Sequence, residues 1–338
     1  MEIRHIVISR TDAIGDVVLT LPMAGFIKKQ MPSCRISFLG RTYTEPIIKR
    51  AQYIDDFINW DQLEKLSDPD RKSQFSSYSI DAIIHVFPFK PIAKLAKQAK
   101  IPLRIGTSHR LFHLLNCNKL INLGRKNSNL HEAQLNIKLL KPFNLDEQCS
   151  LTEITSLYGL SKDNSENERL KELLDTERFN LILHPTSRGS AREWGFDNFS
   201  KLIELLPKNQ FKLFVTGTED DGQLIKEHLL NKHDDLHDLT GKLSLEELID
   251  FIAYSDGLVS ASTGPLHIAA ALGKHALGLY SPMRPIHPGR WAPIGEKANY
   301  FSLNEQCNKC KNDHHCPCIE AIQPSWVMEK LIAIQTGE

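Results

Sequence analysis

The stretch that decides the fold is DGLVSASTGPLHIAAALGKHALGLYSP, residues 256–282. It begins as an apolar strand, turns at a glycine into a helix of small residues, and returns to an apolar strand. This order is typical of one strand–helix–strand step in a parallel sheet. The helix opens at Thr263-Gly264-Pro265, so its first N–H groups and positive dipole end face the mouth of the sheet. The segment predicts a phosphate-binding position near His267, and its alternative is an ordinary buried helix between two strands.

The same alternation continues upstream through the second half of the chain. Strands are expected at 179–184, 211–216, 236–240, 257–260 and 276–280, with helices near 198–206, 220–230 and 245–254. The first half repeats the pattern, with strands at 3–9, 35–40, 56–60 and 80–87 and helices at 17–30 and 45–50. Alternation of this kind builds parallel sheets, so we predict an α/β protein with two doubly wound, Rossmann-like domains facing each other across a cleft.

A polar stretch at 160–178, without any strand pattern, is the expected boundary between the halves. We therefore predict an N-terminal domain at 1–165, a C-terminal domain at 178–322 and a terminal helix at 323–338. In such sheets ligands bind beyond the carboxyl ends of the strands, where the loops of interest lie.

Composition excludes some classes of function. Among 338 residues, 41 Lys and Arg balance 41 Asp and Glu, so no overall basic field suggests nucleic-acid binding. No apolar run approaches the roughly 20 residues that span a bilayer, and the start has no signal-peptide pattern, which favours a cytoplasmic protein. The charge balance fails locally, however. Residues 82–131 contain no Asp or Glu but nine Lys and Arg.

Four of the seven cysteines fall within twelve residues: Cys307, Cys310, Cys316 and Cys318. In a cytoplasmic chain such a cluster is expected to be reduced or metal-bound rather than disulfide-linked. Thiolates with the neighbouring His314 and His315 are suitable zinc ligands, although the spacing is tight for a structural zinc site.

Asp16 follows the first strand and its turn, where an open sheet presents a loop to ligands. A carboxylate there can take a proton from an incoming hydroxyl. The alternative is that Asp16 only stabilises the start of its own helix. Asp12 is a competing candidate in the same loop.

Two loops of the second half carry candidate anion and hydroxyl ligands. The loop HPTSRGSAREW, residues 184–194, offers hydroxyls at Thr186 and Ser187 and a guanidinium at Arg192, which suit a diphosphate. Its alternative is a solvated loop anchored by Trp194. Glu219 follows another strand and can accept from ribose hydroxyls. Neither GxGxxG after the first strand nor GxxxxGK[ST] occurs, which argues against nicotinamide dehydrogenases and P-loop kinases.

Five ordered strings carry a family resemblance: IGDVVLTLP, HPTSRGSAREW, GTEDD, GKLSLEELIDFIAYSDGLVSASTGPLHIAAALG and YSPMRP. Together they resemble a family 9 glycosyltransferase of the heptosyltransferase type, over nearly the whole chain. The resemblance implies a GT-B fold, with an acceptor bound by the N-terminal half and a nucleotide-diphosphate sugar, such as ADP-heptose, by the C-terminal half. It also implies sugar transfer to the lipopolysaccharide core with inversion and without an essential metal or other cofactor.

The resemblance assigns roles by motif. Asp16 resembles the catalytic base. Leu243 falls where members pack against the nucleotide base, and the other expected donor contacts are Thr186, Ser187, Arg192, Glu219, Ser262, Thr263, Gly264 and His267.

The chain departs from the family pattern at two of these positions. Ser262 stands where members commonly carry Asp before Thr-Gly or Ser-Gly, and Arg192 stands where Lys is frequent. A serine cannot replace both contacts that a carboxylate makes to a sugar. Two alternatives therefore stay open beside the transferase, namely a non-catalytic nucleotide-sugar-binding protein with a degenerate site and a sugar-nucleotide epimerase.

The acid-free stretch suggests a partner. Lys90, Lys94 and Lys97 share one helical face, and Arg104, His109 and Arg110 follow. We expect this surface to receive an anionic, lipid-anchored saccharide acceptor through peripheral contact with the inner membrane. The alternative is a solvated helix face.

Overall fold

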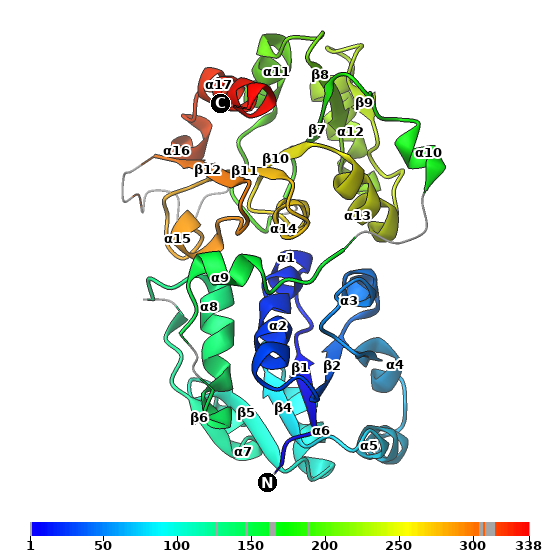
Figure 1. Ribbon diagram of the computed structural model, residues 1–338, viewed down its shortest axis with the longest axis vertical. Coiled ribbons are helices and arrows are strands. Elements are labelled where there is room, and N and C mark those ends of the chain that lie inside the picture. The colour runs from blue at the N-terminus through cyan, green and yellow to red at the C-terminus, as the bar shows by residue number, and fades with distance from the viewer. Residues whose placement is uncertain are drawn as a thin grey trace. The chain divides into compact units, whose positions relative to one another are not determined.

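The computed structural model describes residues 2–125, 128–145, 148–161, 167–187, 189–303, 307 and 315–337. The chain divides into two compact units, Met1–Ser161 and Lys162–Glu338. In Figure 1 the first unit runs from blue to green and the second from green to red. Each unit contains one parallel sheet with its own helices.

The sheet of the first unit has the strand order β3-β2-β1-β4-β5-β6. Its strands are β1 His5–Ser9, β2 Arg35–Gly40, β3 Asp56–Asn59, β4 Ala82–His85, β5 Leu103–Thr107 and β6 Lys119–Ile121. The α-helices are α1 Ile14–Val18, α2 Leu21–Gln30, α3 Glu45–Lys49, α4 Trp60–Glu64, α5 Asp68–Ser77, α6 Lys90–Gln98, α7 Leu111–Asn116, α8 Glu132–Ile137 and α9 Leu151–Thr155. The described residues of this unit also form the 3₁₀ segments η1 Thr42–Thr44 and η3 Lys138–Phe143.

The second unit repeats this topology with the order β12-β11-β10-β7-β8-β9. Its strands are β7 Phe179–His184, β8 Phe211–Val215, β9 His237–Asp238, β10 Gly257–Ala261, β11 His275–Tyr280 and β12 Ala298–Ser302. Its helical segments are α10 Glu168–Lys171, α11 Phe196–Leu205, η4 Glu219–Asp221, α12 Gly222–Ile225, η5 Lys226–Leu230, α13 Leu245–Tyr254, α14 Gly264–Ala271, α15 Pro288–Trp291, α16 Pro317–Glu320 and α17 Pro324–Thr336.

The central strands are apolar because both of their faces are covered. Every residue of β1, β4 and β10 is buried, as expected for parallel strands between helical layers. In both sheets the chain reverses its direction of winding beside the first strand, at β1/β4 and at β7/β10. Ligands of doubly wound folds bind at this switch point.

The predicted helix at 17–30 was wrong in its start and in its continuity. The structure has α1 and α2 instead, separated at Leu19 and Thr20. Pro22 has no N–H to continue the ladder, and it is placed in the first turn of α2, where that loss costs little. Asp16 consequently lies in the first turn of the short helix α1.

The C-terminal helix α17 belongs to the core of the second unit. Its Val327 and Leu331 are buried in the same apolar cluster as Trp194, and α17 packs on α11. Among the described residues, no helix combines the length and apolar character needed to cross a membrane.

Candidate functional site

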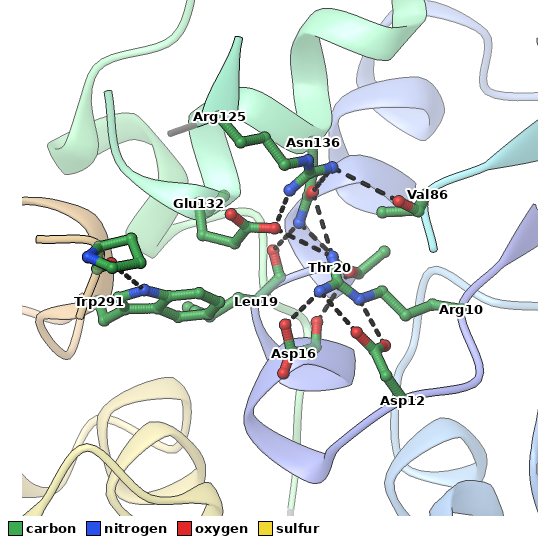
Figure 2. Close-up of polar contacts among 12 residues, drawn as sticks. Arg10, Asp12, Asp16, Leu19, Thr20, Val86, Arg125, Glu132, Asn136 and Trp291 are labelled. Atoms are coloured by element: carbon green, nitrogen blue, oxygen red, sulfur yellow. Dashed lines mark hydrogen bonds and ion pairs between the residues drawn. The ribbon is translucent and has the colours of Figure 1, made fainter. Parts of the chain in front are cut away.

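Arg10 is the centre of a buried polar cluster at the carboxyl end of β1. Its side chain is only 4% exposed, and its backbone N–H donates to Leu39 O at 3.0 Å. The guanidinium donates to both carboxylate oxygens of Asp12, at 2.8 and 3.0 Å, and to Oδ1 of Asp16. Figure 2 shows the two carboxylates on the same side of Arg10. One planar fork therefore holds both acids of the loop.

Helix α8 provides the other side of this cluster. Arg10 Nη1 donates to Glu132 Oε1 at 3.2 Å and to Asn136 Oδ1 at 3.3 Å. Asn136 Nδ2 donates in turn to Leu19 O at 3.1 Å, at the break between α1 and α2. Glu132 is 1% exposed and also accepts from Arg125. Asp16 is thus oriented through contacts with residues far along the chain.

The cluster combines two cations with three acids. The two guanidinium groups of Arg10 and Arg125 face three carboxylates, those of Asp12, Asp16 and Glu132. Burial alone lowers the pKa of Arg10, but Asp16 and Asp12 raise that pKa overall, so Arg10 stays charged. The side chain of Asp16 is 20% exposed. This arrangement suits a carboxylate that accepts a proton from an outside hydroxyl.

In the second unit, loops after β7, β8, β9 and β10 meet at one sheet edge. Ser260 Oγ donates to His184 O at 2.8 Å and is hydrogen-bonded to Thr263 Oγ1 at 2.8 Å. His184 Nδ1 lies 2.9 Å from Thr216 Oγ1. Burial lowers the pKa of His184 to about 4, so its ring is neutral at pH 7. Buried polar contacts therefore connect the strands that carry the predicted donor ligands.

The loop after β7 contains three of the predicted donor contacts. Thr186 is 5% exposed, and its Oγ1 has no hydrogen-bond partner among the described residues. Ser187 is 8% exposed and is held by Glu193, whose Oε1 accepts from the backbone N–H at 2.6 Å and from Oγ at 2.9 Å. Arg192 is partly exposed in the same loop. Of these side chains, Thr186 is the best placed to gain a ligand contact.

Two further predicted contacts lie in neighbouring loops of that edge. Glu219 begins η4 after β8 and is exposed. Gly241 has φ +68°, and a Cβ there would lie 3.0 Å from the Cα of Glu219. Only a residue without a side chain fits this close approach in that conformation. Leu243, partly buried, lies two residues after Gly241, so the structure brings the loops of Glu219 and Leu243 together.

The last four predicted donor contacts surround the start of α14. Thr263 is the N-cap residue of α14, but its hydroxyl pairs with Ser260 and makes no capping hydrogen bond. Ser262 is partly exposed and hydrogen-bonds to Tyr280, whose pKa burial raises. Gly264 is the first residue of the helix, and His267 is 2% exposed in its first turn.

The described part of the cysteine cluster forms no metal site. Cys310 and His314 lie outside the described residues. Among those described, which include Cys307, Cys316 and Cys318, no three His, Cys, Asp or Glu side chains are grouped to hold a metal. Cys316 is fully buried and lies 3.2 Å from Ser281 Oγ, while Cys307 and Cys318 pack against the apolar core. The described residues therefore do not support zinc binding, which was one of the alternatives for this cluster.

Sequence reasoning missed the residues that hold the candidates in place. The sequence shows Arg10 close to Asp12 after the first strand, but it does not show that the Arg10 side chain is buried. Glu193 is only six residues from Ser187 and is visible in the same loop. Glu132 and Asn136 gave no local signal, because they lie 122 and 126 residues from Arg10.

Comparisons with known proteins agree with this architecture. The family model of Glycosyltransferase family 9 (heptosyltransferase) matches residues 78–318. A Haemophilus influenzae protein described as a glycosyltransferase is 27% identical over 308 residues, 88% of each chain. The family 9 glycosyltransferase of Veillonella parvula superposes with a TM-score of 0.82 at 19% identity, covering 100% of this chain and 99% of that one. Escherichia coli ADP-heptose lipopolysaccharide heptosyltransferase II superposes with a TM-score of 0.74 at 18% identity, covering 99% of both chains. The chain therefore belongs to glycosyltransferase family 9, the heptosyltransferase family, and has the GT-B fold.

Proposed function

We propose that this glycosyltransferase moves heptose or a related sugar from a nucleotide-diphosphate donor to a lipopolysaccharide-core acceptor, with inversion and without a metal. Asp16 is the proposed general base. The observation that carries the proposal is the Arg10 cluster, which orients Asp16 while its side chain remains 20% exposed. Asp16 would take the proton of the acceptor hydroxyl as the new bond to the sugar forms.

The second unit is the proposed donor site. As the acceptor oxygen forms its bond to the anomeric carbon, the bond to the diphosphate breaks and negative charge grows on the leaving group. Arg192, His267 and the N-terminus of α14 are the groups proposed to meet it. Thr186, Ser187, Ser262, Thr263 and Gly264 surround the same sheet edge, and Glu219 and Leu243 are proposed to bind the nucleoside. The donor named for the E. coli relative, ADP-heptose, is the first candidate.

The first unit is the proposed acceptor side. Its acid-free stretch gives an excess of positive charge, which suits an anionic, lipid-anchored saccharide at the cytoplasmic face of the inner membrane. Arg104 contributes less than the sequence suggested, because its guanidinium donates to Asn116 O at 2.8 Å and to Ile101 O.

The test is transfer from ADP-heptose to purified core-lipid acceptor in the presence of EDTA, with GDP-heptose and UDP-heptose in parallel. We expect a glycosylated product by mass spectrometry with the anomeric configuration inverted by NMR. Tight donor binding without turnover would instead support the non-catalytic protein. Product formed without acceptor would support the epimerase, and retention of configuration would exclude a single displacement.

A further inference from the structure

Helix α7 presents an apolar face to solvent. Leu111, Leu114 and Leu115 are 75%, 51% and 64% exposed. Their spacing of i, i+3 and i+4 places them on one side of the helix. An apolar helical stripe normally faces the core. Here it faces outward, and adjacent exposed leucines of this kind mark an interaction surface.

The outward direction of this face is fixed by buried contacts. His113, on the other side of α7, is fully buried, and its Nδ1 accepts from Thr107 N at 3.0 Å. The carbonyls at the end of the helix are also occupied. Lys97 Nζ donates to Leu115 O at 2.7 Å, and Arg104 Nε donates to Asn116 O at 2.8 Å. Cations at a helix C-terminus stabilise it, so the leucines are held on a defined surface.

Positive charge surrounds the leucines. Helix α6 packs against α7, and both belong to the stretch 82–131 that has no Asp or Glu. The α6–α7 surface comprises the three leucines and the exposed residues Lys90, Lys94, Lys97, Lys100 and Arg110. An apolar centre flanked by the basic side chains of these two helices matches the acyl boundary and the headgroups of an anionic bilayer.

The surface also has a useful position within the first unit. Strands β1 and β5 are parallel members of one sheet, so α7 begins at the same sheet edge as the loop of Arg10 and Asp16. A bilayer that holds the leucines would thus lie on the unit that carries the proposed base.

We propose that the α6–α7 surface docks on an anionic lipid bilayer, with Leu111, Leu114 and Leu115 inserted at the acyl boundary and the lysines and Arg110 among the headgroups. The proposal deepens the proposed function, on which it rests for the lipid-anchored acceptor. Membrane binding itself requires no catalysis, so it can be measured separately.

The test is co-sedimentation of the full chain with vesicles of phosphatidylethanolamine and phosphatidylglycerol, compared with phosphatidylcholine alone. Wild type is expected to bind the anionic vesicles, less strongly at high salt. Leu111→Ser/Leu114→Ser/Leu115→Ser should lower the partition coefficient about tenfold or more, and Lys90→Glu/Lys94→Glu should lower it too. The controls replace other exposed residues, Leu151, Leu205 and Leu224 by Ser and Lys201 and Lys226 by Glu.

The single substitution Leu111→Ser, at the most exposed of the three positions, controls for misfolding of the triple leucine variant. It should also lower vesicle binding. If the triple leucine variant bound anionic vesicles as strongly as wild type, the proposal would be overturned. The proposal would also be overturned if wild type did not bind anionic vesicles but self-associated through the leucines. Turnover on a water-soluble, deacylated acceptor separates the membrane proposal from the proposed function. The leucine variants should retain this turnover. If wild type binds vesicles but does not turn over this acceptor, only the proposed function is contradicted.

Discussion

The guanidinium of Arg10 binds the carboxylate of Asp16 across six residues of the first loop, and it binds Glu132 from a distant helix at the same time. A buried cation shared among three acids fixes the orientation of their carboxylates. Arg10 is therefore a positioning residue for the proposed base.

Arg10→Gln should move the acid limb of the kcat/KM pH profile to higher pH. Removing the cation raises the pKa of neighbouring carboxylates, so the base becomes protonated at a pH where it was ionised before. Arg10→Lys keeps the charge but loses the planar fork, and we expect kcat to fall about tenfold with a smaller shift of the profile. Arg35→Lys, at an exposed pair with Asp56, is the control and should change neither quantity. An unmoved acid limb in Arg10→Gln would show that Arg10 does not set the ionisation of the base.

Asp16→Asn should lower kcat by about 10²–10⁴-fold, the range expected for loss of a general base. Donor affinity, measured by calorimetry with ADP, should stay unchanged. Asp12→Asn is the matched control, because Asp12 binds the same guanidinium with similar exposure. A larger loss in Asp12→Asn than in Asp16→Asn would transfer the role of base to Asp12.

Thr186→Val should have opposite effects on stability and on donor binding. A buried hydroxyl without a partner destabilises the folded chain, so valine, of similar shape, should raise the free energy of unfolding of the ligand-free protein by about 1 kcal/mol. If Thr186 donates to the donor diphosphate, the same change should weaken ADP binding about tenfold. Ser190→Ala in the same loop controls for general loosening. Unchanged ADP affinity in Thr186→Val would remove Thr186 from the donor site.

His85→Phe should make the protein more resistant to acid. Burial lowers the pKa of His85 from 6.5 to about 3, and neither ring nitrogen has a hydrogen-bond partner among the described residues. Between these two pKa values the unfolded chain binds a proton that the folded chain does not, so stability falls as pH decreases from about 6.5 towards 3. In wild type, this proton lowers the free energy of unfolding by up to about 1.4 kcal/mol for each unit that the pH decreases. His85→Phe should lack this contribution.

The measurement is urea denaturation from pH 7 to pH 4.5, followed by tryptophan fluorescence. His109→Gln is the control, because His109 is exposed. Parallel pH dependences of wild type and His85→Phe would mean that His85 is not the buried neutral group inferred here.

The fold could be predicted wherever a strand was continuous and apolar. The predicted strand at 35–40 matches β2, and the predicted helix at 245–254 matches α13, whose start is marked by the Ser244–Glu247 capping box. Three strands were missed, β5, β6 and β12. β5 contains Arg104 and Gly106, and β6 and β12 lie at the sheet edges with partly exposed side chains. Such strands are defined by pairing with a neighbour rather than by their own hydrophobicity.

By itself, the sequence determined the two parallel sheets, the family and the segment after β1 that carries Asp16, because strand patterns, helix starts and family strings are local properties of the chain. Only the tertiary structure decided which groups surround that carboxylate and where the leucines of α7 point. Arg10, Glu132 and Asn136 meet through packing of α8 against the first loop, and α7 faces solvent because His113 is buried instead. Contacts between distant segments depend on how helices pack on the sheet, and local sequence does not encode that packing.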